Sequence, residues 1–232
     1  MYKLIGIAAL LMFSMLTGFA EVKVTMVKGD VQVRRGVSEE WVPVSVGDAL
    51  KPEDSMRSGK RSSAKMTIDG GKVLEIPESA IIDVSDLRNL TQEELLLMLA
   101  MERVRSVPQR ERNNDFDFLM TTTMHGANKS SATISQPINL ETGMMQLNGT
   151  AMLFKNGFYA TCVLKTKEVF RLVPELSKRN DIRFMVADAL ERMKLPSEAL
   201  SEYVSIPQEQ LSPVQRLEIE RKISQLKKQQ EG

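Results

Sequence analysis

The side chains best suited to catalysis or metal binding are few and lie far apart in the sequence. His125 is the only histidine and Cys162 is the only cysteine. A structural zinc site takes about four nitrogen, sulfur or carboxylate ligands, so these two residues cannot form one without carboxylate help. Asp115 and Asp117 fall well short of the about six to eight oxygen ligands that calcium prefers. We therefore expect no catalytic, cofactor-binding or metal-binding residues.

The sequence motifs of common enzyme classes are absent as well. The chain has no Gly-x-Ser-x-Gly nucleophile elbow, no phosphate-binding loop ending in Gly-Lys-Ser/Thr and no Gly-x-Gly-x-x-Gly. These motifs supply an exposed nucleophile or a row of backbone donors for phosphate. The sequence therefore predicts a non-enzymatic protein without a cofactor. We expect its function to be the binding of a partner.

The charge balance excludes two classes of partner. The chain has 31 basic and 30 acidic residues, and Lys3 is the only charged residue among the first twenty. The remainder is neutral, so it offers no polybasic surface for a phosphate backbone or an anionic membrane. We expect neither nucleic acid nor an anionic membrane surface as a partner.

Residues 1–20 have the form of an export signal. Lys3 precedes a short apolar run, and Gly18-Phe19-Ala20 places small residues where a signal peptidase cuts. The run is shorter than the about 20 apolar residues of a membrane-spanning helix. We expect cleavage after Ala20 and no membrane span afterwards, with an uncleaved anchor as the alternative.

Residues 21–88 have the pattern of a small β-domain. Apolar and polar residues alternate, for example from Ala64 to Ile68, as in strands with one buried face. Asp69-Gly70 predicts a tight hairpin with a positive φ at Gly70. Pro43 places the Trp41–Val46 run at a sheet edge, because proline cannot donate to a ladder. About seven such strands fit a sandwich or roll.

Four pieces of this region occur in a fixed order: Val27–Val31 (VKGDV), Val46–Leu50 (VGDAL), Asp54–Gly59 (DSMRSG) and Ser62–Gly70 (SSAKMTIDG). In this order they resemble the FecR-type periplasmic β-domain. The resemblance implies a periplasmic or cell-envelope protein of a bacterium, with a role in binding or in signalling. In family members with the complete signalling architecture, a cytoplasmic domain controls a sigma factor.

A helix and a linker are predicted to follow the β-domain. Residues 89–105 contain a capping box, in which Thr91 is followed three residues later by Glu94. Leucine and methionine then surround the helix almost completely, so we expect a buried connecting helix. Its neighbours would be the β-domain and either the helical domain or a second copy. Residues 106–142 are polar and turn-rich and are predicted to be a linker, within which Phe116–Met120 could add a strand.

Residues 143–232 are predicted to be helical. Small residues recur at helical spacing, and the pattern resembles two degenerate tetratricopeptide repeats. Cys162 and Ala199 are 37 residues apart, against a usual period of about 34, which predicts an extended loop near Ser177–Asp181. A polar last helix, starting at Ser212, would cap the stack.

These observations predict an α+β protein of two domains, a small all-β sandwich or roll followed by a tetratricopeptide-like array of helical hairpins. Polar side chains on the groove of such an array contact ligands, so Arg183, Asn156 and Lys194 are the expected partner-binding residues. The predicted function is binding of an envelope protein or a cell-wall or surface polymer in the periplasm. The alternative is an accessory, sensor or regulator, of a transmembrane sigma-factor signalling system. The partner and the oligomeric state stay open.

Overall fold

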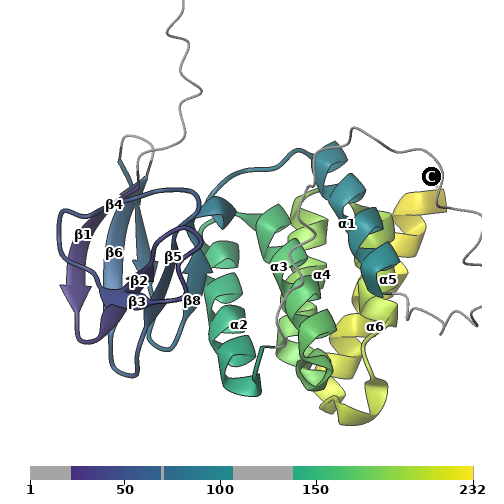
Figure 1. Cartoon of the computed structure of the whole chain (residues 1–232). Helices are drawn as coiled ribbons and strands as arrows, with labels where there is room; N and C mark the ends of the chain where they lie inside the picture. Colours follow the sequence, from purple (N-terminus) through teal and green to yellow (C-terminus); the bar gives the residue numbers. More distant parts are fainter. Residues whose placement is uncertain (1–21, 69–70, 107–137, 232) are drawn as a thin grey trace, which may run out of the picture.

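The computed structural model describes residues 22–68, 71–106 and 138–231 (Figure 1). The β part comes first and the helices follow, which confirms an α+β fold. The predicted signal, the Asp69-Gly70 pair and Phe116–Met120 lie outside the described residues. The strands are β1 Val22–Lys28, β2 Val31–Arg34, β3 Trp41–Pro43, β4 Ala49–Leu50, β5 Ser55–Ser58, β6 Ser63–Ile68, β7 Lys72–Ile76 and β8 Ile81–Asp83.

The strands form two four-stranded antiparallel sheets that enclose one apolar core. Their orders are β4-β1-β6-β7 and β3-β2-β5-β8. In β6 the expected alternation is observed: Ala64, Met66 and Ile68 are buried, and the residues between them are partly exposed. β3 lies at a sheet edge and ends at Pro43, as predicted. These strands therefore form where period-two alternation supplies an inward apolar face.

The hairpin between β6 and β7 is confirmed by its flanking strands. They pair antiparallel up to Ile68 and Lys72. The positive φ expected at Gly70 stays a prediction, whereas the neighbouring Gly71 has φ 146°. Gly29, in the turn before β2, is a position that requires glycine. Its φ is +75°, and an added Cβ would lie 2.5 Å from Ser62 Oγ.

The helix that follows the sandwich begins with the predicted capping box. The Glu94 backbone N–H donates to Thr91 Oγ1 at 3.2 Å, and the Thr91 N–H donates to Glu94 Oε2 at 2.8 Å. Two orphan donors of the first turn are thus satisfied. The helices are α1 Gln92–Ser106, α2 Leu140–Lys155, α3 Tyr159–Leu172, α4 Asn180–Arg192, α5 Pro196–Val204 and α6 Pro213–Glu231, with 3₁₀ turns η2 Val84–Asp86, η3 Pro174–Lys178 and η4 Gln208–Gln210.

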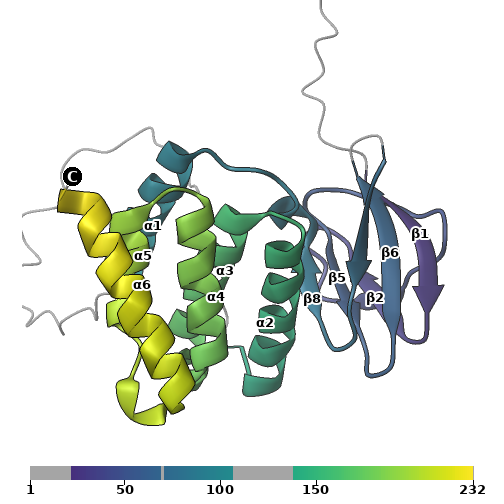
Figure 2. The ribbon, with the colours of Figure 1, turned by 180° about the vertical axis from the view of Figure 1, so that it is seen from behind.

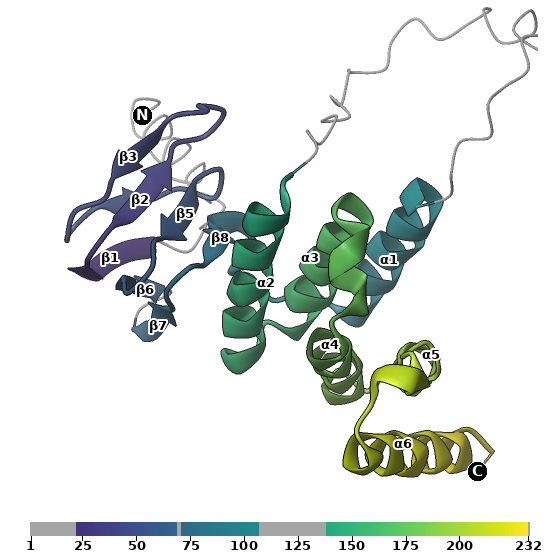
Figure 3. The ribbon, with the colours of Figure 1, turned by 90° about the horizontal axis from the view of Figure 1, so that it is seen from below.

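The expectation that the connecting helix of residues 89–105 is buried on several sides is wrong for the single chain. Only Leu95 and Leu99 of α1 are buried, and the helix packs along α3 (Figure 3). Leu97 and Val104 are 64% and 75% exposed. The helix is as apolar as predicted, but a single chain covers only one of its faces.

Helices α2 to α6 pack in sequence, each against the next (Figure 2). α2 begins at Leu140, within the residues predicted as linker, because the Asn139 side chain caps it by accepting from the Thr142 N–H at 2.7 Å. The extended loop predicted near Ser177–Asp181 lies slightly earlier, between the end of α3 at Leu172 and the start of α4 at Asn180, and it contains η3. Ala187 and Ala199 are fully buried between helices, as expected for small residues there.

The β part and the helices share a core. Four apolar residues of α2, α3 and the turn between them belong to the core of the sandwich: Met152, Leu153, Phe158 and Cys162. α2 lies directly against β8 in all three views (Figures 1, 2 and 3). A Cβ built on Gly149 would lie 2.0 Å from the Ile81 carbonyl oxygen, so only glycine permits this approach. Asn148 Nδ2 donates to the Ser79 carbonyl at 2.8 Å beside it.

We predict that Gly149→Ala destabilises the protein by about 1–3 kcal/mol, because the new methyl group would push α2 away from β8. Chemical denaturation measures this loss. Gly143→Ala is the matched control in the same helix, since its Cβ would meet only side-chain ends, Leu176 Cδ1 at 2.7 Å and Val173 Cγ2 at 3.1 Å. Only side chains and no backbone must shift to admit this methyl group, and alanine favours helix, so the control should lose less than Gly149→Ala. Equal losses would contradict the importance of the contact with β8.

Candidate functional site

A cleft of about 740 Å³ lies where the sandwich, residues 84–90, α1 and α3 meet. This volume is within the range of about 300–1,000 Å³ that is typical of ligand sites. The described lining residues include buried apolar side chains from the β part (Val22, Ile68) and from its connector (Leu87). Met98 and Met101 of α1 line it too and are 38% and 49% exposed. The cleft is therefore built by both parts of the protein and is apolar over much of its lining.

Lys165 is the charged centre of the cleft. Its Nζ lies 2.7 Å from Asp83 Oδ2 of β8 and 3.1 Å from Glu168 Oε2 of its own helix. Burial alone would lower the pKa of Lys165, but the neighbouring carboxylates of Asp83, Asp86 and Glu168 hold it above its usual value. Burial would likewise raise the pKa of Asp83, yet Lys165 keeps it below its usual range. The Lys165–Asp83 ion pair thus ties α3 to the sandwich with both groups charged.

Asp86 is the carboxyl group left without a close cation. It lies in η2 on the wall of the cleft. Its pKa is raised to about 7, mainly by burial and also by the nearby Asp83 and Glu168, while Lys165 and Arg88 act in the opposite direction. Near neutral pH the group is therefore divided between its acid and its carboxylate form. It can donate or accept a hydrogen bond to a ligand in the cleft.

A chain of hydrogen bonds continues from Asp83 across the outer face of the sandwich. Ser55 Oγ donates to Asp83 Oδ1 at 2.6 Å, and Arg34 Nη2 donates to Ser55 Oγ at 3.1 Å. The guanidinium groups of Arg34 and Arg57 lie 5.3 and 4.6 Å from the centre of the Trp41 ring. Trp41 is therefore not part of the sandwich core, and it packs against arginine on the outer face.

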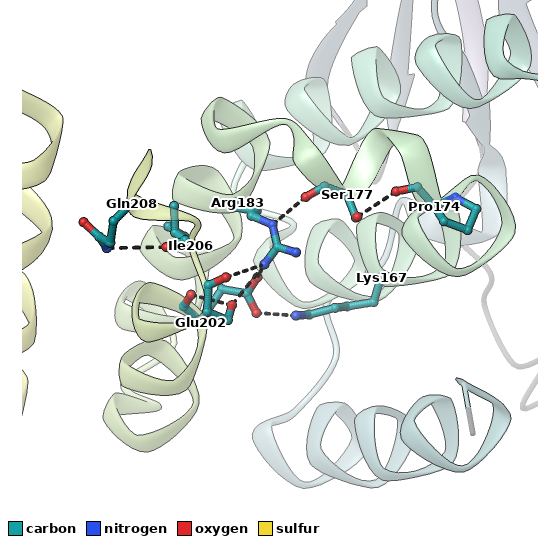
Figure 4. A network of polar contacts seen from close by, with 8 residues as sticks. Lys167, Pro174, Ser177, Arg183, Glu202, Ile206 and Gln208 are labelled. Carbon is teal, nitrogen blue, oxygen red and sulfur yellow. Dashed lines mark hydrogen bonds and ion pairs between the residues drawn. The ribbon is translucent and has the colours of Figure 1, made fainter. Parts of the chain in front are cut away.

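Arg183, one of the three expected partner-binding residues, lies in a network inside the helical part (Figure 4). Its Nε donates to the Ser177 carbonyl at 2.5 Å, and its Nη1 donates to Ser205 Oγ at 3.0 Å. Glu202 pairs with both Arg183 and Lys167, and the Glu202 side chain is only 6% exposed. Arg183 thus joins η3, α4 and α5 and neutralises a buried carboxylate.

Asn156 and Lys194 lie elsewhere. Asn156 is the C-cap of α2, where its Nδ2 donates to the Met152 carbonyl at 2.9 Å and its own carbonyl accepts from Lys72 Nζ at 2.7 Å. Lys194 is exposed in the turn between α4 and α5, with φ 58°. The structure does not bring Arg183, Asn156 and Lys194 together, and none of them lines the cleft. Their role in binding stays a prediction.

Sequence reasoning did not find the cleft, because its described residues come from six separate stretches of the chain and form no motif. The available signal was weak. Asp83 and Asp86 are three residues apart at the end of the β pattern, and Lys165 and Glu168 are three residues apart in a helix. Nothing in the sequence indicates that these two pairs meet. Cys162, by contrast, is buried as expected, and burial raises the pKa of its thiol to about 12, so it is protonated at neutral pH.

Two further observations concern the described ranges only. They contain no group of three or more His, Cys, Asp or Glu residues placed to hold a metal ion. None of their helices combines the length and the apolar character needed to cross a membrane.

No protein-family model, curated protein or solved structure matches this chain.

We predict that Asp86→Asn stabilises the protein at about pH 8 and that this gain falls away towards about pH 4. Folding raises the pKa of Asp86 from 3.8 to about 7, so the stability that its protonation contributes is complete below about pH 3.8 and is lost progressively as the pH rises from there to about 7. Asparagine cannot ionise and avoids this loss. Melting temperatures of parent and variant across this pH range test the sign.

Asp54→Asn is the control of opposite sign. Burial would raise the pKa of Asp54, but hydrogen bonds from the Lys51 and Gly36 backbones and from Arg35 hold it below its usual value. This variant should be less stable than the parent at about pH 8, where the ionised form of Asp54 is favoured. An Asp86→Asn variant that also loses stability at that pH would show that ionised Asp86 stabilises the fold.

Proposed function

We propose that the protein is a non-enzymatic, exported protein of a bacterial cell envelope, and that it binds an apolar segment of a partner protein in the cleft. The observation that carries this proposal is the composition of the cleft wall. It combines buried apolar side chains with two half-exposed methionines, Met98 and Met101. Methionine side chains adapt to irregular apolar surfaces and are typical of peptide-binding sites. Asp86 and Arg88 at the edge add polar groups that can fix the orientation of a bound segment.

The lining of the cleft favours a protein over a polysaccharide. Sugar rings stack on open aromatic faces, and Phe158 is the one aromatic residue among the described lining residues. Phe158 is only 3% exposed, and Lys72 Nζ lies 4.1 Å from the centre of its ring. The ring is therefore closed to a ligand, while the methionines remain accessible. A cell-wall or surface polymer is accordingly the weaker of the two partner classes.

We further infer that the two parts are a FecR-type β-domain and two tetratricopeptide-like repeats. In support of the first, the described residues of the four FecR-like pieces all lie in the sandwich and its turns. In support of the second, α2/α3 and α4/α5 are consecutive helix pairs, and α2 also contacts α4. The first repeat departs from the pattern, because Gly149 of α2 faces β8 and not a helix. Docking on the sandwich thus replaces part of the usual repeat surface.

The proposed export and the signalling alternative are both supported by features of the sequence. The short apolar run ending in Gly18-Phe19-Ala20 supports a cleaved signal and a periplasmic or envelope location. In the signalling alternative, the same cleft would bind a membrane partner of a sigma-factor system. The two versions of the proposal share one site and differ in the identity of the bound protein.

The test begins with a photo-crosslinking amino acid placed at Arg88, on the exposed edge of the cleft, and at Ser201, an exposed position on α5, as the control. Crosslinking in the envelope followed by mass spectrometry should give an apolar peptide from Arg88 and not from Ser201. Equal products from both positions, or a product that contains sugar only, would contradict the proposal.

The partner identified in this way is then titrated against two variants. Ser85→Trp places a large ring in the cleft and should weaken binding at least tenfold, because the ring occupies the volume that the partner segment needs. Ser201→Trp carries the same substitution outside the cleft and should bind like the parent. Melting temperatures close to that of the parent for both variants separate loss of binding from loss of folding. Unchanged binding by Ser85→Trp would place the partner site elsewhere.

A further inference from the structure

Exposed apolar side chains are concentrated on one face of α1. Five of the fourteen large exposed apolar residues in the described ranges belong to this 15-residue helix. Its opposite face is occupied, since Leu95 and Leu99 are buried against neighbouring helices. A face of this kind in a soluble protein marks an interaction surface. The five residues are Leu96, Leu97, Met98, Met101 and Val104.

The centre of this face is a continuous stripe. With about 100° of rotation per residue, Leu97, Met101 and Val104 follow one another on the side directly opposite Leu95 and Leu99. Ala100 lies beside the middle of the stripe and is also exposed. Its small side chain would let another helix approach closely, as small residues do at helix contacts.

The charges at the two ends of the stripe are of opposite sign. Glu94 lies in the first turn and Arg105 in the last, and the same rotation places both on one flank of the stripe. Arg105 is 62% exposed, and its ion pair with Glu102 is long, at 3.7 Å. Glu102 itself is engaged by Arg171 of α3. The guanidinium group of Arg105 is therefore available to another partner.

We propose that α1 pairs in antiparallel orientation with α1 of a second copy of this chain, around a two-fold axis near Ala100. When Leu97 faces Val104 of the second copy, Glu94 falls within about 3 Å, along the helix axis, of Arg105 of the second copy. Residues on the same flank meet in an antiparallel pair, so both ends gain an acid–base contact. The opposed helix dipoles add to this. In a parallel pair the same flank of the two copies lies on opposite sides of the interface, so Glu94 and Arg105 would not meet.

The pairing goes beyond the proposed binding function and can fail independently of it. The dimer uses the outer stripe of α1, whereas the partner segment is proposed to lie in the cleft between α1 and the sandwich. Met98, Met101 and Arg105 also line the cleft, whereas Leu97 does not, so a substitution of Leu97 tests the pairing without changing the cleft lining. A dimer of this kind would hold two clefts on one assembly and would raise the affinity for a partner that presents two segments.

Light scattering coupled to size-exclusion chromatography tests the pairing on the purified protein over a wide range of concentration. The parent should have twice the mass of the chain. Leu97→Glu should reduce the mass to that of a single chain, because it places a charge in the apolar stripe. Leu217→Glu is the matched control, since Leu217 is a similarly exposed leucine, 69%, on α6, and this variant should remain a dimer. Circular dichroism checks that both variants fold.

The orientation is tested by charge reversal and by crosslinking. Arg105→Glu should weaken the dimer at least tenfold, whereas Arg105→Lys, which keeps the positive charge, should remain close to the parent; Glu94 is left unchanged because it caps α1. Ala100→Cys should form a disulfide-linked dimer on oxidation, whereas Arg103→Cys, on the far flank, should not; Cys162 is buried and does not compete. A parent protein that is a monomer at every concentration overturns the proposal. Crosslinking through Arg103→Cys and not Ala100→Cys overturns the orientation.

Discussion

The contact between the backbone of α2 at Gly149 and the Ile81 carbonyl of β8 is the constraint on which the rest of the structure depends. It brings a helix to a distance that no other amino acid at position 149 allows. The turn after α2 then carries Phe158 to the end of the sandwich core, and α3 adds Cys162. A small sandwich alone buries a modest apolar area, so this extension of its core is a direct gain in stability.

The position of α3 follows from that contact and determines the electrostatics of the cleft. Lys165 reaches Asp83 because α3 runs past the end of β8. An ion pair in such a place costs desolvation and is retained only when both partners are well placed, which makes it sensitive to the docking of α2. Asp86, one turn further along the chain, has a raised pKa mainly because it is buried, and Lys165, which is also paired with Asp83 and Glu168, offsets this only in part. The cleft, its charge and its pH response thus derive from one interface.

Local features of the fold could be predicted from the sequence, because they depend on neighbouring residues. The alternation in β6, the edge position of Pro43 and the capping box at Thr91 are all of this kind. The exposure of α1 could not be predicted, since composition indicates that a face is apolar and not which neighbour covers it. The same holds for Arg183, whose polar side chain suggested a groove but neutralises the buried Glu202. The cleft depends on tertiary contacts throughout, so no single segment carries its signature.

The most direct test of this account follows denaturant-induced unfolding with two probes on the same protein. Trp41 is the only tryptophan, and its fluorescence reports on the sandwich. Far-ultraviolet circular dichroism reports mainly on the helices. If the two parts share one core, the two transitions coincide in midpoint and steepness, as expected for a single cooperative unit. Two separate transitions, with the helices unfolding while Trp41 keeps its native signal, would contradict the account.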